Sequence, residues 1–459
     1  MPLSKDIINQ TLESPHGSEA YHVAEKLIDA GFDTWWVGGA VRDMALGVIP
    51  KDIDIATEAT PDQIAKVFPK LDATTAVLGS VRVTQKGHTF EVTTFREDDE
   101  ASDGRHPESV QFGDRQHDAK RRDITVNALY WNPISRELWD PFGGEKDLEE
   151  RLIRIIGEPG IRIKHDALRL LRVVRFRAQL QGQFHPDTYA ALRENARLIE
   201  DLSGSRQLEE LEKMLKGQYA DRALEDLWEL GIIQYFLPEL GVCKGVPQPK
   251  DYHHEGDVWE HMLRVVRSFR SEDGIDVRIA GLFHDAGKAK TFELKERIRF
   301  DHHATVSAEL AEDALKRLQM PGKRVQKISW IIKHHMMMGA FVATESGSEP
   351  MSDERKAHWY FHPWFQELLQ LFYLDIAGTD PSDYELYNKI VQDFHRFLDK
   401  NPRPPRQLLT GDEIMEIVGL APGARVGEIL KLLHDAQITG EITTKKEAME
   451  FLRKLQPKS

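Results

Sequence analysis

The sequence predicts an α+β protein, with a mixed N-terminal third followed by a largely helical remainder. Short apolar runs are typical of strands, and three occur before residue 150: DTWWV (33–37), IDIAT (53–57) and HTFEVTTF (88–95). Beyond that point, apolar residues recur every three to four positions, which is the period of a helix. The 459 residues also exceed the size that a single core usually supports, so we expect several domains.

The composition is that of a globular protein and excludes several other classes. The chain is 41% apolar and 30% charged, and no run approaches the roughly 18 apolar residues that cross a bilayer, so no membrane partner is expected. The first residues, MPLSKDIINQ, lack the apolar core of a secretory signal. Cys243 is the single cysteine, which excludes a disulfide framework or a cage of thiolates around a metal. We therefore expect a cytoplasmic protein in a reducing environment.

The elements of the N-terminal third can be followed along the chain. An amphipathic helix ends at Gly31, and the first strand then runs into a glycine turn and a short helix, VRDMALG. SVRVTQ and HTFEVTTF predict a hairpin that turns at Lys86-Gly87, and the polar segment 97–120 predicts a mobile loop. DPFGGEKDLEE predicts a turn that leads into a helix. Proline and glycine cluster near 245–254 and 401–407, which predicts domains over 1–150, 151–245, 246–400 and 401–459.

Two aspartates follow the glycine turn at a spacing that suits metal binding. On a strand, residues two apart project to one face, so Asp52 and Asp54 would point together while Ile53 and Ile55 face the core. Paired carboxylates are ligands for hard divalent cations such as Mg²⁺, and like charges this close need a cation or a proton between them. An exposed strand without any metal shows the same spacing, so the pair alone does not decide.

The glycine turn favours the metal site because it adds a phosphate-binding element. Gly38 and Gly39 let backbone N–H groups approach a phosphate chain, and Arg42 can neutralise its charge. A triphosphate held beside a metal is the arrangement that in-line attack on an α-phosphate requires. The chain has a net charge of −14, but residues 151–180 carry a net charge of +6. That stretch suits a phosphate-bearing partner or, alternatively, a solvated helix face.

An ordered series of motifs resembles the class II tRNA nucleotidyltransferases and bacterial poly(A) polymerases of the DNA polymerase beta superfamily. The motifs are GGAVRDMALGVIPKDIDIAT (38–57), EVTTFR (91–96), SDGRHP (102–107), RRDITVNAL (121–129), DPFGGEKDL (140–148) and HDALRLLRVVRF (165–176). The resemblance implies a nucleotidyltransferase fold for the first domain, followed by a helical neck that binds nucleotide and RNA. It assigns Asp52 and Asp54 to catalytic Mg²⁺. The residues that it assigns to the triphosphate are Gly38, Gly39 and Arg42, and those that it assigns to the ribose are Arg121, Arg122 and Asp123.

In this family, a helix with a Glu-Asp-x-x-Arg pattern acts as a protein template for the incoming base, and HDALR stands at that position here. Asp166 and Arg169 would share a helix face and offer acceptors and donors to C or A, with Arg172 next on the same face. Arg175 lies about half a turn from Asp166, so it meets phosphate or supports the fold. His165 replaces the family's glutamate and would steer Arg169 more weakly than a carboxylate, unless it is a solvated residue at a helix start.

The helical region holds a second group of metal-binding residue types. His284 and Asp285 are adjacent in an apolar stretch, where they cannot be buried without partners. Over roughly residues 250–380 the chain resembles the HD phosphohydrolase superfamily, whose helices bring two histidines and two aspartates to a divalent ion; the matching residues are His261, His284, Asp285 and Asp375. His303 and His335 would be further ligands of a dinuclear site or structural histidines. Such ligands suit Ni, Mn, Mg or Zn.

These features predict a template-independent enzyme that adds C, C and A to tRNA 3′ ends from CTP and ATP. An A-adding tRNA nucleotidyltransferase and a poly(A) polymerase are the alternatives of the same class. The retained SDGRHP and the long loop leave A addition possible, and full CCA addition is the first choice. The short tail 445–459 and the HD domain disfavour the polymerase. An alternative of another class makes the HD domain the working phosphohydrolase and the N-terminal region a non-catalytic RNA-binding module. Alongside CCA addition, the HD site would hydrolyse a phosphomonoester or a 2′,3′-cyclic phosphate.

Overall fold

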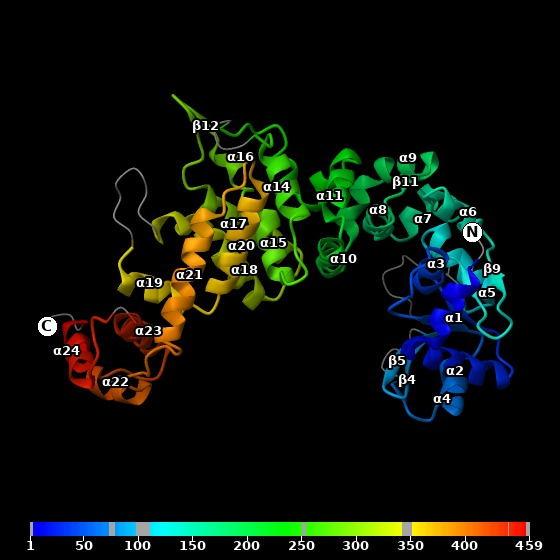
Figure 1. Ribbon diagram of the computed structural model, residues 1–459, viewed down its shortest axis with the longest axis horizontal. Helices are drawn as coiled ribbons and strands as arrows, with labels where there is room; N and C mark the ends of the chain where they lie inside the picture. Colours follow the sequence, from blue (N-terminus) through cyan, green and yellow to red (C-terminus); the bar gives the residue numbers. More distant parts are fainter. Residues whose placement is uncertain are drawn as a thin grey trace. The chain divides into compact units, whose positions relative to one another are not determined.

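The computed structural model describes residues 3–72, 79–97, 111–249, 254–341, 351–438 and 440–455. The chain forms two compact units, residues 1–241 and 242–459, and each is described by itself (Figure 1). The first unit contains a mixed sheet with helices and the second is almost entirely helical, so the predicted fold class is confirmed. The boundary between the units lies close to the one predicted at 245, while the divisions at 150 and 400 stay predictions.

A seven-stranded sheet forms the centre of the first unit, in the order β3-β4-β5-β2-β1-β8-β9. Its strands are β1 (Thr34–Val37), β2 (Asp54–Thr57), β3 (Leu71–Asp72), β4 (Ser80–Gln85), β5 (His88–Thr94), β8 (Tyr130–Trp131) and β9 (Leu138–Trp139). β1 runs antiparallel to β2 with Val37 opposite Asp54, and β2 runs parallel to β5. This register places the residue before the glycine turn across from one acid of the predicted pair.

Apolar side chains cover both faces of the sheet, so β1 is buried at every position. Trp36 and Ile55 belong to one core cluster, which also includes residues of α1 (Lys5–Glu13), α2 (Pro15–Asp29), α3 (Gly39–Ala45) and α4 (Pro61–Val67). Trp35 and Ala56 face the other way, into a second cluster. Because neighbouring residues of a strand project to opposite faces, the TWWV run fills both cores and holds the glycine turn rigidly at the end of β1.

The predicted hairpin is confirmed in detail. β4 and β5 pair antiparallel, with Gln85 opposite His88, so that only Lys86 and Gly87 connect them. Both residues have positive φ, 45° and 87°, which is the backbone of a two-residue type I′ turn. A glycine adopts this conformation without strain, and that preference made the turn predictable from the sequence.

The prediction of a loop over residues 97–120 is wrong for the described part of that segment. β6 (Arg96–Glu97) pairs with β7 (Gln111–Phe112), and α5 (Arg115–Arg121) follows, with Asp114 as its N-cap. The Arg115 guanidinium lies 4.1 Å from the ring centroid of Trp35 and 4.4 Å from that of Trp139. These cation–π contacts stabilise α5 against the sheet. Residues 98–110, with the SDGRHP motif, lie outside the described residues.

Short helices complete the first unit after the sheet. The Asp140 carboxylate accepts from the N–H groups of Gly144 and Glu145 and starts α6, as DPFGGEKDLEE predicted. The remaining elements are η2 (Thr125–Asn127), α6 (Gly144–Glu149), β10 (Leu152–Ile153), α7 (Pro159–His165), α8 (Arg169–Gln179), β11 (Gln183–Phe184), α9 (Pro186–Glu194), η3 (Ala196–Asp201), α10 (Gly204–Lys216), α11 (Ala220–Glu229), α12 (Ile233–Phe236) and α13 (Pro238–Gly241).

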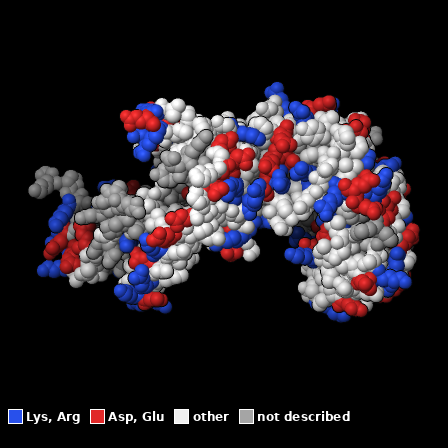
Figure 2. Space-filling model, turned by 45° about the horizontal axis from the view of Figure 1, so that its top comes forward, with Lys and Arg blue, Asp and Glu red and all other residues white. Residues whose placement is uncertain are grey.

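The basic stretch 151–180 is mostly engaged inside the first unit. Four of its arginines form ion pairs with carboxylates elsewhere in the unit, such as Arg175 with Glu210 at 2.8 Å. Six of its basic side chains have internal partners: Arg154, Arg162, Arg169, Arg172, Arg175 and Arg177. Most of this positive charge is therefore paired inside the unit rather than free on a solvated face, and a phosphate-bearing partner for the stretch stays a prediction. On the face that Figure 2 shows, Lys and Arg are interspersed with Asp and Glu.

The second unit is a cluster of helices with a separate C-terminal core. Its elements are α14 (Val258–Arg267), α15 (Ile275–Phe283), α16 (Lys288–Thr291), β12 (Glu293–Leu294), β13 (Ile298–Arg299), α17 (His303–Arg317), α18 (Gly322–His334), η4 (His335–Phe341), α19 (Asp353–Tyr360), α20 (Phe365–Gly378), α21 (Glu385–Lys400), α22 (Gly411–Val418), α23 (Ala424–Ile438) and α24 (Lys445–Leu455). The last three pack on their own apolar cluster. Among the described helices of the chain, none has the length and hydropathy to cross a membrane.

Candidate active site and metal centre

Asp52 and Asp54 lie where β1 runs into the glycine turn. β2 begins at Asp54, so Asp52 precedes the strand, but the two exposed acids alternate with buried isoleucines as predicted. Across the described ranges, neither carboxylate has a hydrogen-bond or ion-pair partner. Burial raises the pKa of Asp54, and so do the carboxylates of Glu91 and Asp52, while the Arg122 guanidinium lowers it. Two unpaired, mutually repelling carboxylates are a donor set that fits a hard divalent cation.

The glycine turn has a backbone that requires glycine. At Gly38 φ is 68° and ψ is −128°, a conformation that residues with a Cβ rarely adopt. A Cβ at this position would lie 3.0 Å from Nη1 of Arg122, so that guanidinium lies against the turn. On α3, which begins at Gly39, Arg42 donates to Asp43 and, at 2.8 Å, to Oδ1 of Asn127. The two guanidinium groups bring hydrogen-bond donors to this end of β1, which suits a phosphate chain.

A buried carboxylate on α5 orients both arginines of the RRD motif. Oδ1 of Asp118 accepts from Nε of Arg121 at 2.7 Å, and Oδ2 accepts from Nη2 of Arg122 at 3.2 Å. The Tyr130 hydroxyl donates to the same Oδ2 at 2.6 Å and accepts from Nε of Arg122 at 2.8 Å. Burial opposes ionisation of Asp118, but the guanidinium groups of Arg122 and Arg121 lower its pKa to about 2. The ionised carboxylate therefore holds the two guanidinium groups in place.

Asp123 contacts a different set of residues from its neighbour Arg122. Its Oδ2 accepts from Nη2 and Nε of Arg172 at 2.6 and 3.0 Å, and its Oδ1 accepts from Nδ2 of Asn127 at 3.2 Å. Burial opposes ionisation, but Arg172 and the hydrogen bonds lower the pKa of Asp123. Since Asn127 also accepts from Arg42, a continuous chain of hydrogen bonds runs from Arg42 through Asn127 and Asp123 to Arg172.

The predicted base-reading helix is interrupted at Asp166. α7 ends at His165, Asp166 is extended with φ −146° and ψ 99°, and α8 begins at Arg169. The prediction that Asp166 and Arg169 share one helix face is therefore wrong, and so is the placement of His165 at a helix start. The Asp166 carboxylate accepts from the N–H of Leu168, a local bond that competes with helical hydrogen bonding. It also pairs with Arg206 of α10 at 3.1 Å.

Arg169 and Arg175 mainly hold the neck together. Arg169 is 7% exposed, and its guanidinium donates to the carbonyl oxygens of Arg162 and Arg121 at 2.8 and 3.2 Å. It thereby joins α8 to the RRD motif. Arg175 pairs with the buried Glu210, so the structural role that was one of its two predicted interpretations is confirmed. Arg172 of α8 contacts Asp123 of the site directly.

Three residues that complete the site were missed by sequence reasoning: Asn127, Asp118 and Tyr130. Asp118 precedes Arg121 and Arg122 by three and four residues, a spacing that indicates pairing once the segment is recognised as a helix. Asn127 and Tyr130 stand in the apolar run ITVNALYW, where a single polar group gives no signal by itself.

Six side chains converge in the second unit, and they include all the predicted HD residues. They fall into two groups, and within each group the ligand atoms lie within 4.8 Å of one another. The first group is His261, His284 and Asp375, and the second is Asp285, His303 and His335. Within the first group the atom pairs are 3.1–3.4 Å apart. Atoms about 2.1 Å from one ion have about this separation in tetrahedral or octahedral geometry. The histidines predicted as optional further ligands, His303 and His335, lie 3.5 and 4.0 Å from Oδ1 of Asp285.

The imidazole rings are oriented as metal ligands require. Nδ1 of each ring lies against an acceptor: Glu255 for His261, and the carbonyl oxygens of Gly281, Phe300 and Ile332 for His284, His303 and His335. A ring that donates from Nδ1 keeps the lone pair of Nε2 for a cation. Burial lowers the pKa of His284, but the carboxylates of Asp285 and Asp375 raise it to about 10. The centre therefore attracts positive charge, which fits a divalent ion.

Comparison with known proteins agrees with both sites. Family models match a poly A polymerase head domain over residues 34–154, a probable RNA and SrmB-binding site of polymerase A over 183–243, and an HD domain over 252–356. The acid pair and the glycine turn lie in the first region, and five of the six converging side chains lie in the third. Nucleotidyltransferase and HD domains typically use divalent metals, in keeping with both donor sets.

Relatives match about half of the chain or more than nine-tenths of it. A CCA-adding enzyme of Geobacillus stearothermophilus is 42% identical over 227 residues, which are 49% of this chain and 56% of that enzyme, so the match spans about half of the relative. An A-adding tRNA nucleotidyltransferase of Deinococcus radiodurans is 32% identical over 91% of this chain and 94% of that enzyme. The crystal structure of Bacillus stearothermophilus CCA-adding enzyme in complex with CTP is 27% identical, with a TM-score of 0.67 over 96% of this chain and 98% of that one. The chain therefore belongs to the tRNA nucleotidyltransferase family.

Proposed function

We propose that the first unit adds C, C and A to the 3′ ends of tRNA, using CTP and ATP. The observation that carries this proposal is the meeting of an unpaired acid pair, Asp52 and Asp54, with a glycine turn flanked by Arg42 and Arg122. The similarity to a CCA-adding enzyme that was solved with CTP supports the choice of nucleotide. The name of the A-adding tRNA nucleotidyltransferase supports tRNA as the acceptor.

In this reaction the 3′ oxygen of the RNA forms a bond to the α-phosphorus, and the bond from that phosphorus to the bridging oxygen of pyrophosphate breaks. Mg²⁺ held by Asp52 and Asp54 would supply stabilisation of the attacking and leaving oxygens. The backbone of Gly38 and Gly39 and the guanidinium of Arg42 would bind the triphosphate.

The two halves of the RRD motif would take different parts of the nucleotide. Arg122 lies against the glycine turn, so we assign it to the phosphates, and Arg121 supports it through their shared carboxylate partner. Asp123 and Arg172 form a carboxylate–guanidinium pair, which offers an acceptor and a donor to a ribose 2′-hydroxyl. We still propose that Asp166 and Arg169 select the base. The two residues lie at the junction of α7 and α8 rather than on one helix face.

Extension of three tRNA substrates tests the proposal. The full chain is incubated with tRNA that lacks CCA, lacks only the terminal A, or is complete, together with labelled CTP or ATP. Termination after CCA supports the proposal. The variant with both Asp52→Ala and Asp54→Ala should lose incorporation, whereas Asp6→Ala, a change of an acid in the first turn of α1, should keep it. Unchanged incorporation by the double variant would refute the site.

A-specific addition is the second candidate of the same class. It is favoured by the A-adding relative, which matches nearly the whole chain. The same assay separates the two: A-addition alone gives product only on tRNA that ends one nucleotide short. Unlimited addition of A would instead indicate a poly(A) polymerase.

The HD centre supports a second activity, hydrolysis of a phosphomonoester or a 2′,3′-cyclic phosphate. Its support is the convergence of four imidazoles and two carboxylates on a buried centre. Ni, Mn, Mg or Zn fits these ligands, and a bound ion would supply a hydroxide at neutral pH. Release of phosphate from a tRNA 3′ end, or opening of a cyclic phosphate, should require one of these ions and should be lost in His284→Ala. An absence of product with all four ions would refute this activity while CCA addition stands.

A further inference from the structure

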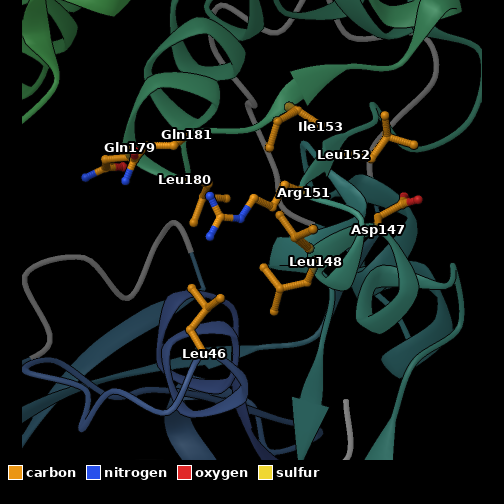
Figure 3. Close-up of a pocket in the computed structure, with 10 residues that line it drawn as sticks. Leu46, Asp147, Leu148, Arg151, Leu152, Ile153, Gln179, Leu180 and Gln181 are labelled. Atoms are coloured by element: carbon orange, nitrogen blue, oxygen red, sulfur yellow. The ribbon is translucent and has the colours of Figure 1, made fainter.

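A pocket in the first unit contains a cation that the proposed nucleotide site does not use. The pocket has a volume of about 190 Å³ and lies at the C-terminal ends of α3 and α8. Its lining includes Leu46, Leu148 and Leu180, the amides of Gln179 and Gln181, and Arg151. Figure 3 shows the Arg151 guanidinium lying among the leucine side chains. The volume is below the roughly 300 Å³ at which small-molecule sites begin, so the pocket suits part of a polymer chain better than a second nucleoside triphosphate.

Arg151 differs from most of the basic stretch to which it belongs. Six of the eight basic side chains in 151–180 have internal partners, and within the described residues Arg151 and Lys164 have none. The one carboxylate that lines the pocket, Asp147, is already bonded to Arg154 and Thr125. No carboxylate of the described residues therefore pairs with Arg151, and an anion from outside can do so.

An exposed apolar segment links the pocket to the acid pair along the chain, because it begins at Leu46 in the pocket lining and ends just before Asp52. Leu46, Val48 and Ile49 are 44%, 54% and 42% exposed, and Asp52 follows three residues after the last of them. Exposed apolar side chains that adjoin a cation offer the two surfaces of a single-stranded nucleic acid, its base faces and its phosphates. No such apolar run adjoins Lys164, whose neighbour on α7 is the single exposed Ile161.

We infer that this pocket and the Leu46–Ile49 segment bind the single-stranded 3′ end of the RNA acceptor, with Arg151 on a phosphate. The inference rests on the proposed nucleotidyltransferase function and adds the path of the acceptor strand to it. Along α8, Gln179 is about 10 Å from Arg172 at 1.5 Å per residue. A stacked strand rises roughly 3.4 Å per nucleotide, so we assign the pocket to the nucleotides one to three positions before the reacting 3′ end.

Binding of RNA to the full chain, without nucleotide, tests the phosphate contact. Arg151→Gln should weaken the binding of tRNA that lacks CCA by about threefold to tenfold and reduce the slope of log K against log salt by about 0.7. Arg151→Lys should retain the slope. The matched control is Lys146→Gln, because Lys146 is an exposed cation of α6 outside the pocket, and it should bind like wild type. Equal affinities and slopes for Arg151→Gln and wild type would overturn the inference.

A cross-link tests the position of the strand. Cys243 is buried and its thiol pKa is raised to about 12, so a Leu46→Cys variant can be labelled at the new thiol with a benzophenone maleimide. Irradiation with bound tRNA should attach the label to the last three nucleotides of the RNA. Attachment to the duplex stem, or labelling of CTP instead of RNA, would overturn the inference. Because both tests measure binding, they can succeed or fail independently of nucleotide addition, whose absence in wild type would refute the proposed function instead.

Discussion

Asn127→Ala tests whether the chain of hydrogen bonds from Arg42 to Arg172 works as a unit. Asn127 is 7% exposed and connects two charged groups: it accepts from Arg42 at 2.8 Å and donates to Asp123 at 3.2 Å. Hydrogen bonds to charged groups contribute about 1.5–3 kcal/mol each. Taking the lower value for both gives about 3 kcal/mol, which corresponds to roughly a 100-fold loss of kcat/KM for CTP.

The assay is incorporation of CTP and of dCTP into tRNA that lacks CCA. Since Asn127 positions the carboxylate that we assign to the 2′-hydroxyl, the preference for CTP over dCTP should also fall. A loss of stability alone would slow both substrates equally. Asn195→Ala is the matched control, because Asn195 is a buried asparagine of the neck that donates to the Ala191 carbonyl. A variant of Asn127 with wild-type kcat/KM and an unchanged preference for CTP would refute the reasoning.

Three further predictions concern stability and metal binding. Asp118 has a pKa of about 2 in the folded chain, against a usual 3.8. Its ionised form therefore stabilises the fold above pH 4 by about 2 kcal/mol. This contribution is lost as the pH falls through 2. Denaturant unfolding of Asp118→Asn should therefore show a weaker dependence on pH in that range than wild type, and equal dependence would contradict the assignment. Glu255→Gln should lower the affinity of the HD centre for a divalent ion by about 10-fold to 100-fold, measured by calorimetry, because Glu255 orients His261; unchanged affinity would remove Glu255 from that role. Gly87→Ala should lower the free energy of unfolding by about 1 kcal/mol, because φ is 87° there, and a neutral effect would argue against the type I′ turn.

The parts of the fold that followed from the sequence are those where local chemistry and final structure agree. Lys86-Gly87 between two alternating runs predicts a tight hairpin because a glycine adopts positive φ without strain. His284 and Asp285 predict a polar centre because neither residue type is buried in an apolar helix without a partner. In both cases, the identity of one or two residues decides the outcome.

The parts that did not follow depend on tertiary partners. The polar composition of 97–120 predicts a loop, but Arg115 packs on two tryptophans from distant strands and α5 begins there. HDALR reads as a continuous helix, but Asp166 makes a local turn and pairs with Arg206, forty residues later. Six basic residues of 151–180 have internal partners, and for three of these residues the partner is a carboxylate distant in sequence. A charge count could therefore not distinguish a buried network from a binding surface.

The register of β1 on β2 limits how this chain can change in length. An insertion between 47 and 51 leaves Val37 paired with Asp54, so natural variation can accumulate there without disturbing the pairing. An insertion just before Gly38 would move the turn about 3.4 Å beyond its present position next to the Val37–Asp54 pair. Backbone hydrogen bonds, which do not depend on side-chain identity, therefore fix the spacing between the glycine turn and the acid pair.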